Sequence, residues 1–200
     1  MHNEVTHVFA HFCKQAGLKN IMLEPALEPL SGEKFSYKTT NVEDSARADL
    51  AVTGLWTCLR KAFFDTMVVH PQASSYNNKS IPAILKLAEQ KKKREYQRRI
   101  NLVENSDFSP LVFTTNGAMG SQAIFVVKRL CELLATKSNH NLSLVTGHFR
   151  CRLSFALLRS SLICLRGSRP IKRNAVECDF DYSIHRLMFE NESILILVSF

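Results

Sequence analysis

The chain has 200 residues and a formal net charge of +8, and its 46% hydrophobic and 22% charged residues exclude a disordered, collagen-like or low-complexity protein. No apolar run approaches the roughly 18 residues that cross a bilayer, and the first residues lack the basic start and apolar core of a secretory signal. We therefore expect an intracellular protein, nuclear or cytoplasmic and not secreted, with no membrane partner. The excess of Lys and Arg favours an anionic partner, of which nucleic acid is the commonest.

The first half of the chain predicts one helix followed by strands. Apolar residues at helical spacing predict a helix over residues 2–16, which Gly17 ends. A short apolar segment at residues 20–28 contains Pro25 and is typical of an edge strand. Residues 29–46 are predicted to form a loop with a short extended piece at Phe35–Thr39. Strands are predicted at Ala48–Trp56 and Ala62–His70, and the short connection between them indicates an antiparallel hairpin.

The second half adds one strand among helices. A long helix is predicted from Pro82 to about Glu104, a buried strand over Pro110–Thr115, and two helices near 121–137 and 143–166. The resulting α-β-β-β-α-β-α-α order predicts an α/β fold, with a mixed sheet of about four strands flanked by helices. We assign residues 1–167 to this domain. Residues 168–200 are expected to form an atypical C-terminal tail, either an added edge strand or an extension outside the fold.

The cysteine pattern indicates thiols rather than a zinc ribbon. The six cysteines form no Cys-x-x-Cys pair and most lie in apolar stretches, so we expect reduced, buried side chains. His7 and His11 are four residues apart with Cys13 nearby, which is compatible with metal ligands on one helical face. A packed amphipathic helix explains the same spacing without a metal.

Two aspartates are the strongest candidates for chemistry. Asp49 lies near the start of one predicted strand, and Asp65 lies inside the next among apolar neighbours. A carboxylate in an apolar strand is costly unless it is paired, solvated or bound to a metal. The hairpin would bring both carboxylates to one cation such as Mg²⁺, which can activate a water for phosphodiester cleavage. The alternative has Asp49 capping a turn near Arg47 and Asp65 paired with Lys61 or Arg60.

Several segments together carry a family resemblance. Asp49 and Asp65 resemble the pattern of the PD-(D/E)XK nuclease superfamily. In that pattern two acidic residues are separated by about the length of a hairpin, and a basic residue stands two positions after the second one. Between His2 and Arg169 the chain also resembles a nuclease-like domain found downstream of the reverse transcriptase in animal retrotransposon polyproteins. The segments that carry this second resemblance are His2-Asn3-Glu4, Glu28-Pro29-Leu30-Ser31-Gly32-Glu33, Ala46-Arg47-Ala48-Asp49, Ala62-Phe63-Phe64-Asp65, Glu89–Tyr96, Pro110-Leu111-Val112-Phe113, Gly117-Ala118-Met119-Gly120 and the run from Cys151 to Ser160.

The resemblance implies a restriction-endonuclease-like core and a metal-dependent activity. By position, Glu4, Asp49 and Asp65 match the acidic catalytic residues, with Asp49 and Asp65 as ligands of Mg²⁺ or Mn²⁺. The implied partners are nucleic acid, DNA above all, and the reverse transcriptase region of a parent polyprotein.

One position departs from this pattern. Met67 stands two residues after Asp65, where the superfamily has a lysine that orients the attacking water and stabilises negative charge, which methionine cannot do. Some members take the basic group from the neighbouring helix, where this chain has Lys91, Lys92 and Arg94. Two hypotheses therefore stay open. One is a mobile-element-derived nuclease that binds and cuts DNA, and the other is an inactive nucleic-acid-binding or polyprotein interaction module on the same scaffold.

Basic residues gather on two predicted helices. The long helix carries seven Lys or Arg between Lys86 and Arg99, and the last helix places Arg152 and Arg159 seven residues apart. We take Lys91, Lys92, Arg94, Arg98, Arg152 and Arg159 as candidate phosphate contacts. An ordinary solvated helix surface is the alternative. The strand-to-helix loop 116–120 suits an anion by its geometry, although a plain tight turn fits it better.

Overall fold

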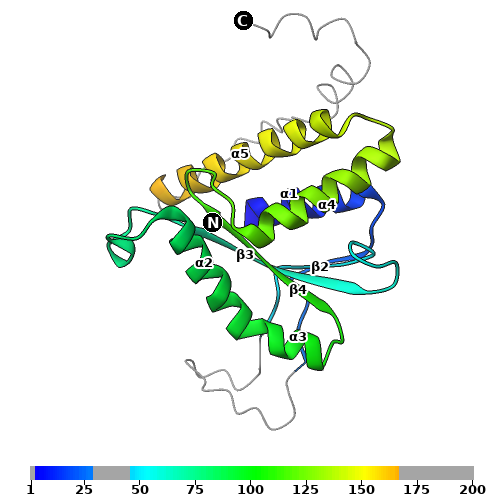
Figure 1. Ribbon diagram of the computed structural model, residues 1–200, viewed down its shortest axis with the longest axis horizontal. Coiled ribbons are helices and arrows are strands. Elements are labelled where there is room, and N and C mark those ends of the chain that lie inside the picture. The colour runs from blue at the N-terminus through cyan, green and yellow to red at the C-terminus, as the bar shows by residue number, and fades with distance from the viewer. Residues whose placement is uncertain (1–2, 29–45, 167–200) are drawn as a thin grey trace, which may run out of the picture. The chain divides into compact units, whose positions relative to one another are not determined.

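The computed structural model describes residues 3–28 and 46–166 and contains one mixed sheet between two helical layers (Figure 1). The strands are β1 (Lys19–Leu23), β2 (Leu50–Thr53), β3 (Lys61–Val69) and β4 (Asp107–Thr114), and the helices are α1 (Asn3–Ala16), α2 (Ile81–Lys92), α3 (Arg98–Leu102), α4 (Ser121–Ser138) and α5 (Leu142–Arg166). The predicted α/β class with four strands is confirmed. The predicted extended piece at 35–39 and the tail 168–200 lie outside the described residues.

The sheet has the strand order β1-β2-β3-β4 and mixes both pairing directions. β2 pairs antiparallel with β1 and with β3, as the predicted hairpin requires, and β3 pairs parallel with β4. A parallel pair needs a crossover, which the helices between residues 81 and 102 supply. Pro110 lies in β4 at the edge of the sheet, where a residue without an N–H is tolerated.

Alternating side chains of β3 pack into different layers. Ala62 and Phe64 join a large core with α1, α4 and α5, whereas Phe63 packs with Ile100 of α3 and Val69 packs with Ile84 of α2. This is the period-two pattern of a strand buried on both faces. Asp65 shares the parity of Phe63 and Val69, so the fold directs this carboxylate toward the α2–α3 layer.

The predicted long helix is not a uniform α-helix. Residues 93–97 form a π-helical segment between α2 and α3. Inward positions recur every four residues along this stretch, from Ile84 through Ala88 to Tyr96 and Ile100. In an α-helix each step of four turns the side chain about 40° too far. The wider π turn compensates for this drift and keeps the later residues directed at the sheet.

The helix α5 lies over α1 and α4 and is the longest described helix, with 25 residues. Its inner side buries Phe149, Leu153 and Leu157, while Phe155 and Leu158 are exposed on its outer side. Within residues 3–28 and 46–166, no helix combines the length and apolar character needed to cross a membrane.

The cysteine prediction was only partly right. Cys13 and Cys131 are buried, and burial raises the pKa of both thiols. Cys58, Cys151 and Cys164 are exposed, because Cys58 lies in the hairpin turn and the other two lie on the outer side of α5. Apolar sequence neighbours therefore did not identify buried thiols.

Two phenylalanines of α5 form a matched test of this packing. Phe149 is 0% exposed and packs against Phe9 and Phe12, whereas Phe155 is 66% exposed. We expect Phe149→Ala to lower the free energy of unfolding by about 3–5 kcal/mol, because it removes a fully buried ring. We expect Phe155→Ala to change it by less than about 0.5 kcal/mol. Urea denaturation measures both, and equal losses would contradict the arrangement of α5.

Candidate functional site

The candidate site begins with a buried ion pair between the sheet and the helix that crosses over it. Asp65, in the middle of β3, is 4% exposed, and its Oδ2 lies 2.8 Å from Nζ of Lys92 at the end of α2. The Lys92 ammonium also lies 5.3 Å from the centre of the Tyr96 ring and 3.9 Å from a carboxylate oxygen of Glu95. A buried carboxylate is thereby matched with a largely buried cation.

Asp49 lies directly beside this pair. It precedes β2, its backbone N–H donates to the carbonyl of Phe64, and its Oδ2 accepts a hydrogen bond from the Thr66 N–H at 2.6 Å. The carboxylate thus takes the place of a backbone acceptor at the point where the β2–β3 ladder stops. This contact fixes Asp49 beside residues 64–66, next to Asp65 in the chain.

The environment of Asp65 raises its pKa from an ordinary value of 3.8 to about 6. Burial is the main cause, because it disfavours the charged form, and the Lys92 ammonium opposes it. The nearby charges of Asp49 and Glu95 raise the pKa further. At pH 7 Asp65 is still mostly ionised, so the site holds two adjacent carboxylates.

The donor set at this place fits Mg²⁺ in part. Mg²⁺ is commonly held by one or two carboxylates together with waters and substrate phosphates, and Asp49 and Asp65 supply two. Glu4, the third acidic candidate, instead forms an ion pair with Arg159 of α5 at 3.7 Å. Within the described ranges, no group of three or more His, Cys, Asp or Glu side chains could hold a metal ion.

The alternative partners considered for the two aspartates have other contacts. Arg47 pairs with Glu24 at 3.8 Å, and Arg60 pairs with Asp107 at 3.1 Å. The partner of Asp65 is Lys92 from the helix. Met67, two residues after Asp65, is partly buried against the apolar cluster of Val69 and Ile84 and brings no charge.

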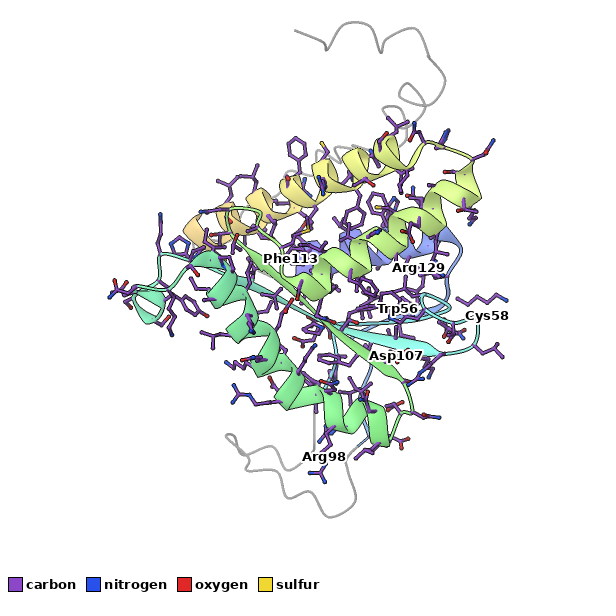
Figure 2. All side chains as sticks on the ribbon, viewed as in Figure 1. Trp56, Cys58, Arg98, Asp107, Phe113 and Arg129 are labelled. Carbon is purple, nitrogen blue, oxygen red and sulfur yellow. The ribbon has the colours of Figure 1, made fainter. Side chains whose placement is uncertain are left out.

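The candidate phosphate contacts divide by exposure. Lys91, Arg94 and Arg98 are exposed on one helical stretch, and Figure 2 shows Arg98 pointing outward from the end that α3 forms. Lys92 points inward to Asp65 instead. On α5, Arg152 and Arg159 are exposed, and Arg159 shares its charge with Glu4. Three residues of the long helix therefore form an outward basic face.

The place beside the loop 116–120 where an anion could bind is occupied by a side chain of the protein. The buried carboxylate of Glu89 on α2 accepts hydrogen bonds from the Ser121 hydroxyl and the Gln122 N–H, both at 2.9 Å, at the start of α4. A Cβ at Gly120 would collide with this carboxylate. Glu89 occupies the place that a phosphate would need and caps the N-terminus of α4.

Sequence reasoning named Lys92 twice, as a phosphate contact and, with Lys91 and Arg94, as a helix residue able to supply the basic group near Asp65, and it did not single out Lys92 among the three. The missed signal is the four-residue repeat of inward positions, since Lys92 lies midway between Ala88 and Tyr96. A lysine on the inner side of a helix that packs on a strand with a buried aspartate is a candidate ion-pair partner.

The chain was compared with protein-family models and with curated proteins, and neither comparison found a match. The candidate site therefore depends on its own geometry.

The raised pKa of Asp65 predicts a pH-dependent stability. The folded state binds the proton more tightly than the unfolded state, so this stabilising contribution is complete below pH about 4 and is lost as the pH rises through about 6. Two units of pKa correspond to about 3 kcal/mol. We expect the unfolding free energy of the wild type, relative to Asp65→Asn, to fall by roughly that amount in this window. Urea denaturation across the window measures it, with Asp107→Asn as control, and parallel curves for wild type and Asp65→Asn would contradict it.

Proposed function

We propose that this chain is a metal-dependent nuclease-like domain that binds DNA and hydrolyses phosphodiester bonds, with a restriction-endonuclease-like core. The resemblance between His2 and Arg169 to nuclease-like domains of retrotransposon polyproteins agrees with this proposal. The observation that carries it is the meeting of two carboxylates, Asp49 and Asp65, with the Lys92 ammonium at one point of the sheet.

This combination supports phosphodiester chemistry in particular. Asp49 and Asp65 would hold Mg²⁺ or Mn²⁺, which when bound supplies an activated water and neutralises charge on the phosphate. Lys92 would fill the role of the basic residue that Met67 cannot fill, because a cation close to the carboxylates can stabilise negative charge that develops on the substrate. The 2.8 Å ion pair holds this ammonium beside Asp65 before any substrate arrives.

The exposed basic face supports DNA as the substrate. Lys91, Arg94 and Arg98 lie on the same helical stretch as Lys92, so phosphate contacts there would bring a backbone toward the carboxylates. Such contacts position a nucleic acid without reading its sequence. The net charge of +8 favours the same partner.

Plasmid nicking in the presence of Mg²⁺ or Mn²⁺ tests the activity. We expect Asp65→Asn to reduce the nicking rate at least about 100-fold, because one of two metal-holding carboxylates is lost. Lys92→Met should reduce the rate by about two to four orders of magnitude if its charge acts on the reacting phosphate.

The matched control is Asp107→Asn, which removes another ion-paired strand aspartate, on β4. It should nick like the wild type. Equal nicking by wild type and Asp65→Asn would remove Asp65 from the mechanism, and equal nicking by wild type and Lys92→Met would remove Lys92.

An inactive nucleic-acid-binding or polyprotein interaction module is the second candidate. It is favoured by Met67 at the usual lysine position and by Glu4 being paired with Arg159. Under this hypothesis the wild type binds DNA without nicking it, and we expect Met67→Lys to restore nicking, because residue 67 shares the sheet face of Asp65. Nicking that stays absent in Met67→Lys would rule out decay at this one position.

A further inference from the structure

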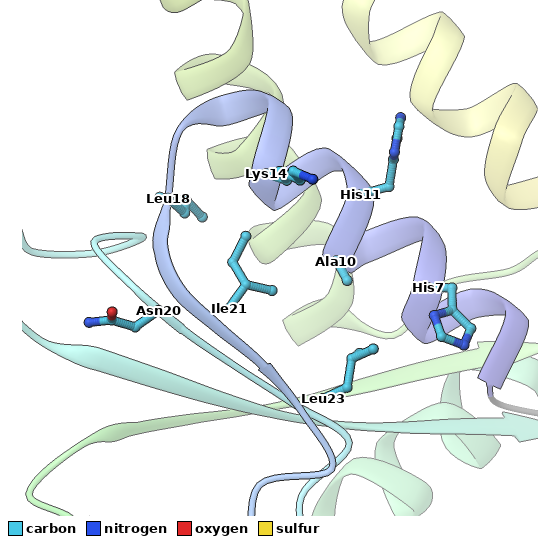
Figure 3. Close-up of a pocket in the computed structure, with 8 residues that line it drawn as sticks. All are labelled: His7, Ala10, His11, Lys14, Leu18, Asn20, Ile21 and Leu23. Atoms are coloured by element: carbon cyan, nitrogen blue, oxygen red, sulfur yellow. The ribbon is translucent and has the colours of Figure 1, made fainter. Parts of the chain in front are cut away.

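Figure 3 shows a groove between α1 and β1. The helix α1 packs on the opposite side of the sheet from Lys92. The volume of the groove is about 520 Å³. The α1 side is lined by His7, His11 and Lys14, which lie at helical spacing, with Ala10 between them, and the strand side contributes Leu18, Ile21 and Leu23. The α1 side chains that pack into the core, such as Phe9 and Cys13, point away from this wall.

The two walls differ in chemistry in a way that suits a nucleotide. A lysine and two imidazoles can donate hydrogen bonds to phosphate oxygens, and an imidazole can also stack on a base. The aliphatic side chains of the other wall offer an apolar surface to a base or sugar. Asn20, also on this strand, adds an amide that can pair with a base edge.

The groove continues toward the candidate site. A smaller hollow of about 50 Å³ shares His7 and Leu23 with it and is also lined by Asp49. Glu24 also lines this hollow, and its charge is balanced by Arg47 at 3.8 Å. The path from Lys14 along α1 therefore ends at one of the two carboxylates.

We propose that the α1–β1 groove binds a single strand of nucleic acid and leads its backbone to Asp49. This inference rests on the proposed nuclease function and adds a second route to Asp49, for single-stranded nucleic acid, from the side of the sheet opposite Lys92. A volume of about 520 Å³ equals a cube with an edge of about 8 Å, which accommodates a nucleotide or two. Duplex DNA, whose major groove alone is about 12 Å wide, does not enter such a hollow.

Binding of labelled octathymidylate, measured by fluorescence anisotropy in EDTA, tests the groove without cleavage. We expect Lys14→Ala to weaken binding several-fold and to reduce the slope of log affinity against log salt by about 0.7, the effect of one lost phosphate contact on a single strand. His7→Ala should also weaken binding. The matched control is Lys128→Ala, which removes an exposed lysine from α4, outside the groove, and should bind like the wild type.

Imidazole NMR signals report where the oligonucleotide binds, which the anisotropy measurement does not. On titration with tetrathymidylate, the His7 and His11 signals should shift while that of His140, in the turn before α5, stays in place. Unchanged His7 and His11 signals, equal affinities of Lys14→Ala and Lys128→Ala, or stronger competition by duplex than by single strand would each overturn the inference. Plasmid nicking is scored separately, so duplex cleavage without single-strand binding would reject the groove and leave the proposed function standing.

Discussion

The contact between Asp65 and Lys92 constrains the arrangement of the whole α2–α3 layer. Asp65 lies in β3, a central strand of the sheet, and is 4% exposed beneath the helix that carries Lys92. An unpaired charge at such a place costs several kcal/mol, and removing one partner of a buried pair typically costs about 3–5 kcal/mol. The crossover helix must therefore bring its ammonium to within 2.8 Å of this carboxylate, which fixes where α2 ends over the sheet.

Thr66, the residue after Asp65, connects the sheet to the helical layer that contains α1. Thr66 points away from Lys92, and its hydroxyl bonds to that of Thr6 on α1 at 3.1 Å, while its N–H donates to Asp49. Two consecutive residues of β3 thus connect α2, α1 and the segment before β2. Because these contacts are polar and buried, each restricts geometry more than an apolar contact of the same size. The candidate site lies where the three elements are held together.

Much of the fold follows from patterns that lie within single elements. The helices α1 and α4 were predicted closely because their apolar residues keep helical spacing, and β3 because nine residues of dense apolar sequence follow a short turn. The ends of β2 were not predictable in this way. Residues 48–56 read as one strand, but only Leu50–Thr53 form it: before it the Asp49 carboxylate accepts the Thr66 N–H, and after it the hairpin turn begins at Gly54, which has a positive φ. The candidate site was likewise predictable only where the signal lies within one element. Asp49 and Asp65 stand out from apolar neighbours in the sequence, whereas which of the basic residues on the following helix faces Asp65 depends on how α2 packs on the sheet.

The two carboxylates have different neighbours, which limits how a substrate could use them. Asp65 is directed at Lys92 in the α2–α3 layer, and Asp49 lines the small hollow that opens toward the α1–β1 groove. A phosphate that approaches along the groove would meet Asp49 first and would reach Lys92 only past the end of the β2–β3 ladder. A metal ion at the proposed site would be held by Asp49 and Asp65 and would supply the activated water. The proposed chemistry therefore depends on the hydrogen bond from the Thr66 N–H to the Asp49 carboxylate, because this bond holds the carboxylate beside Asp65.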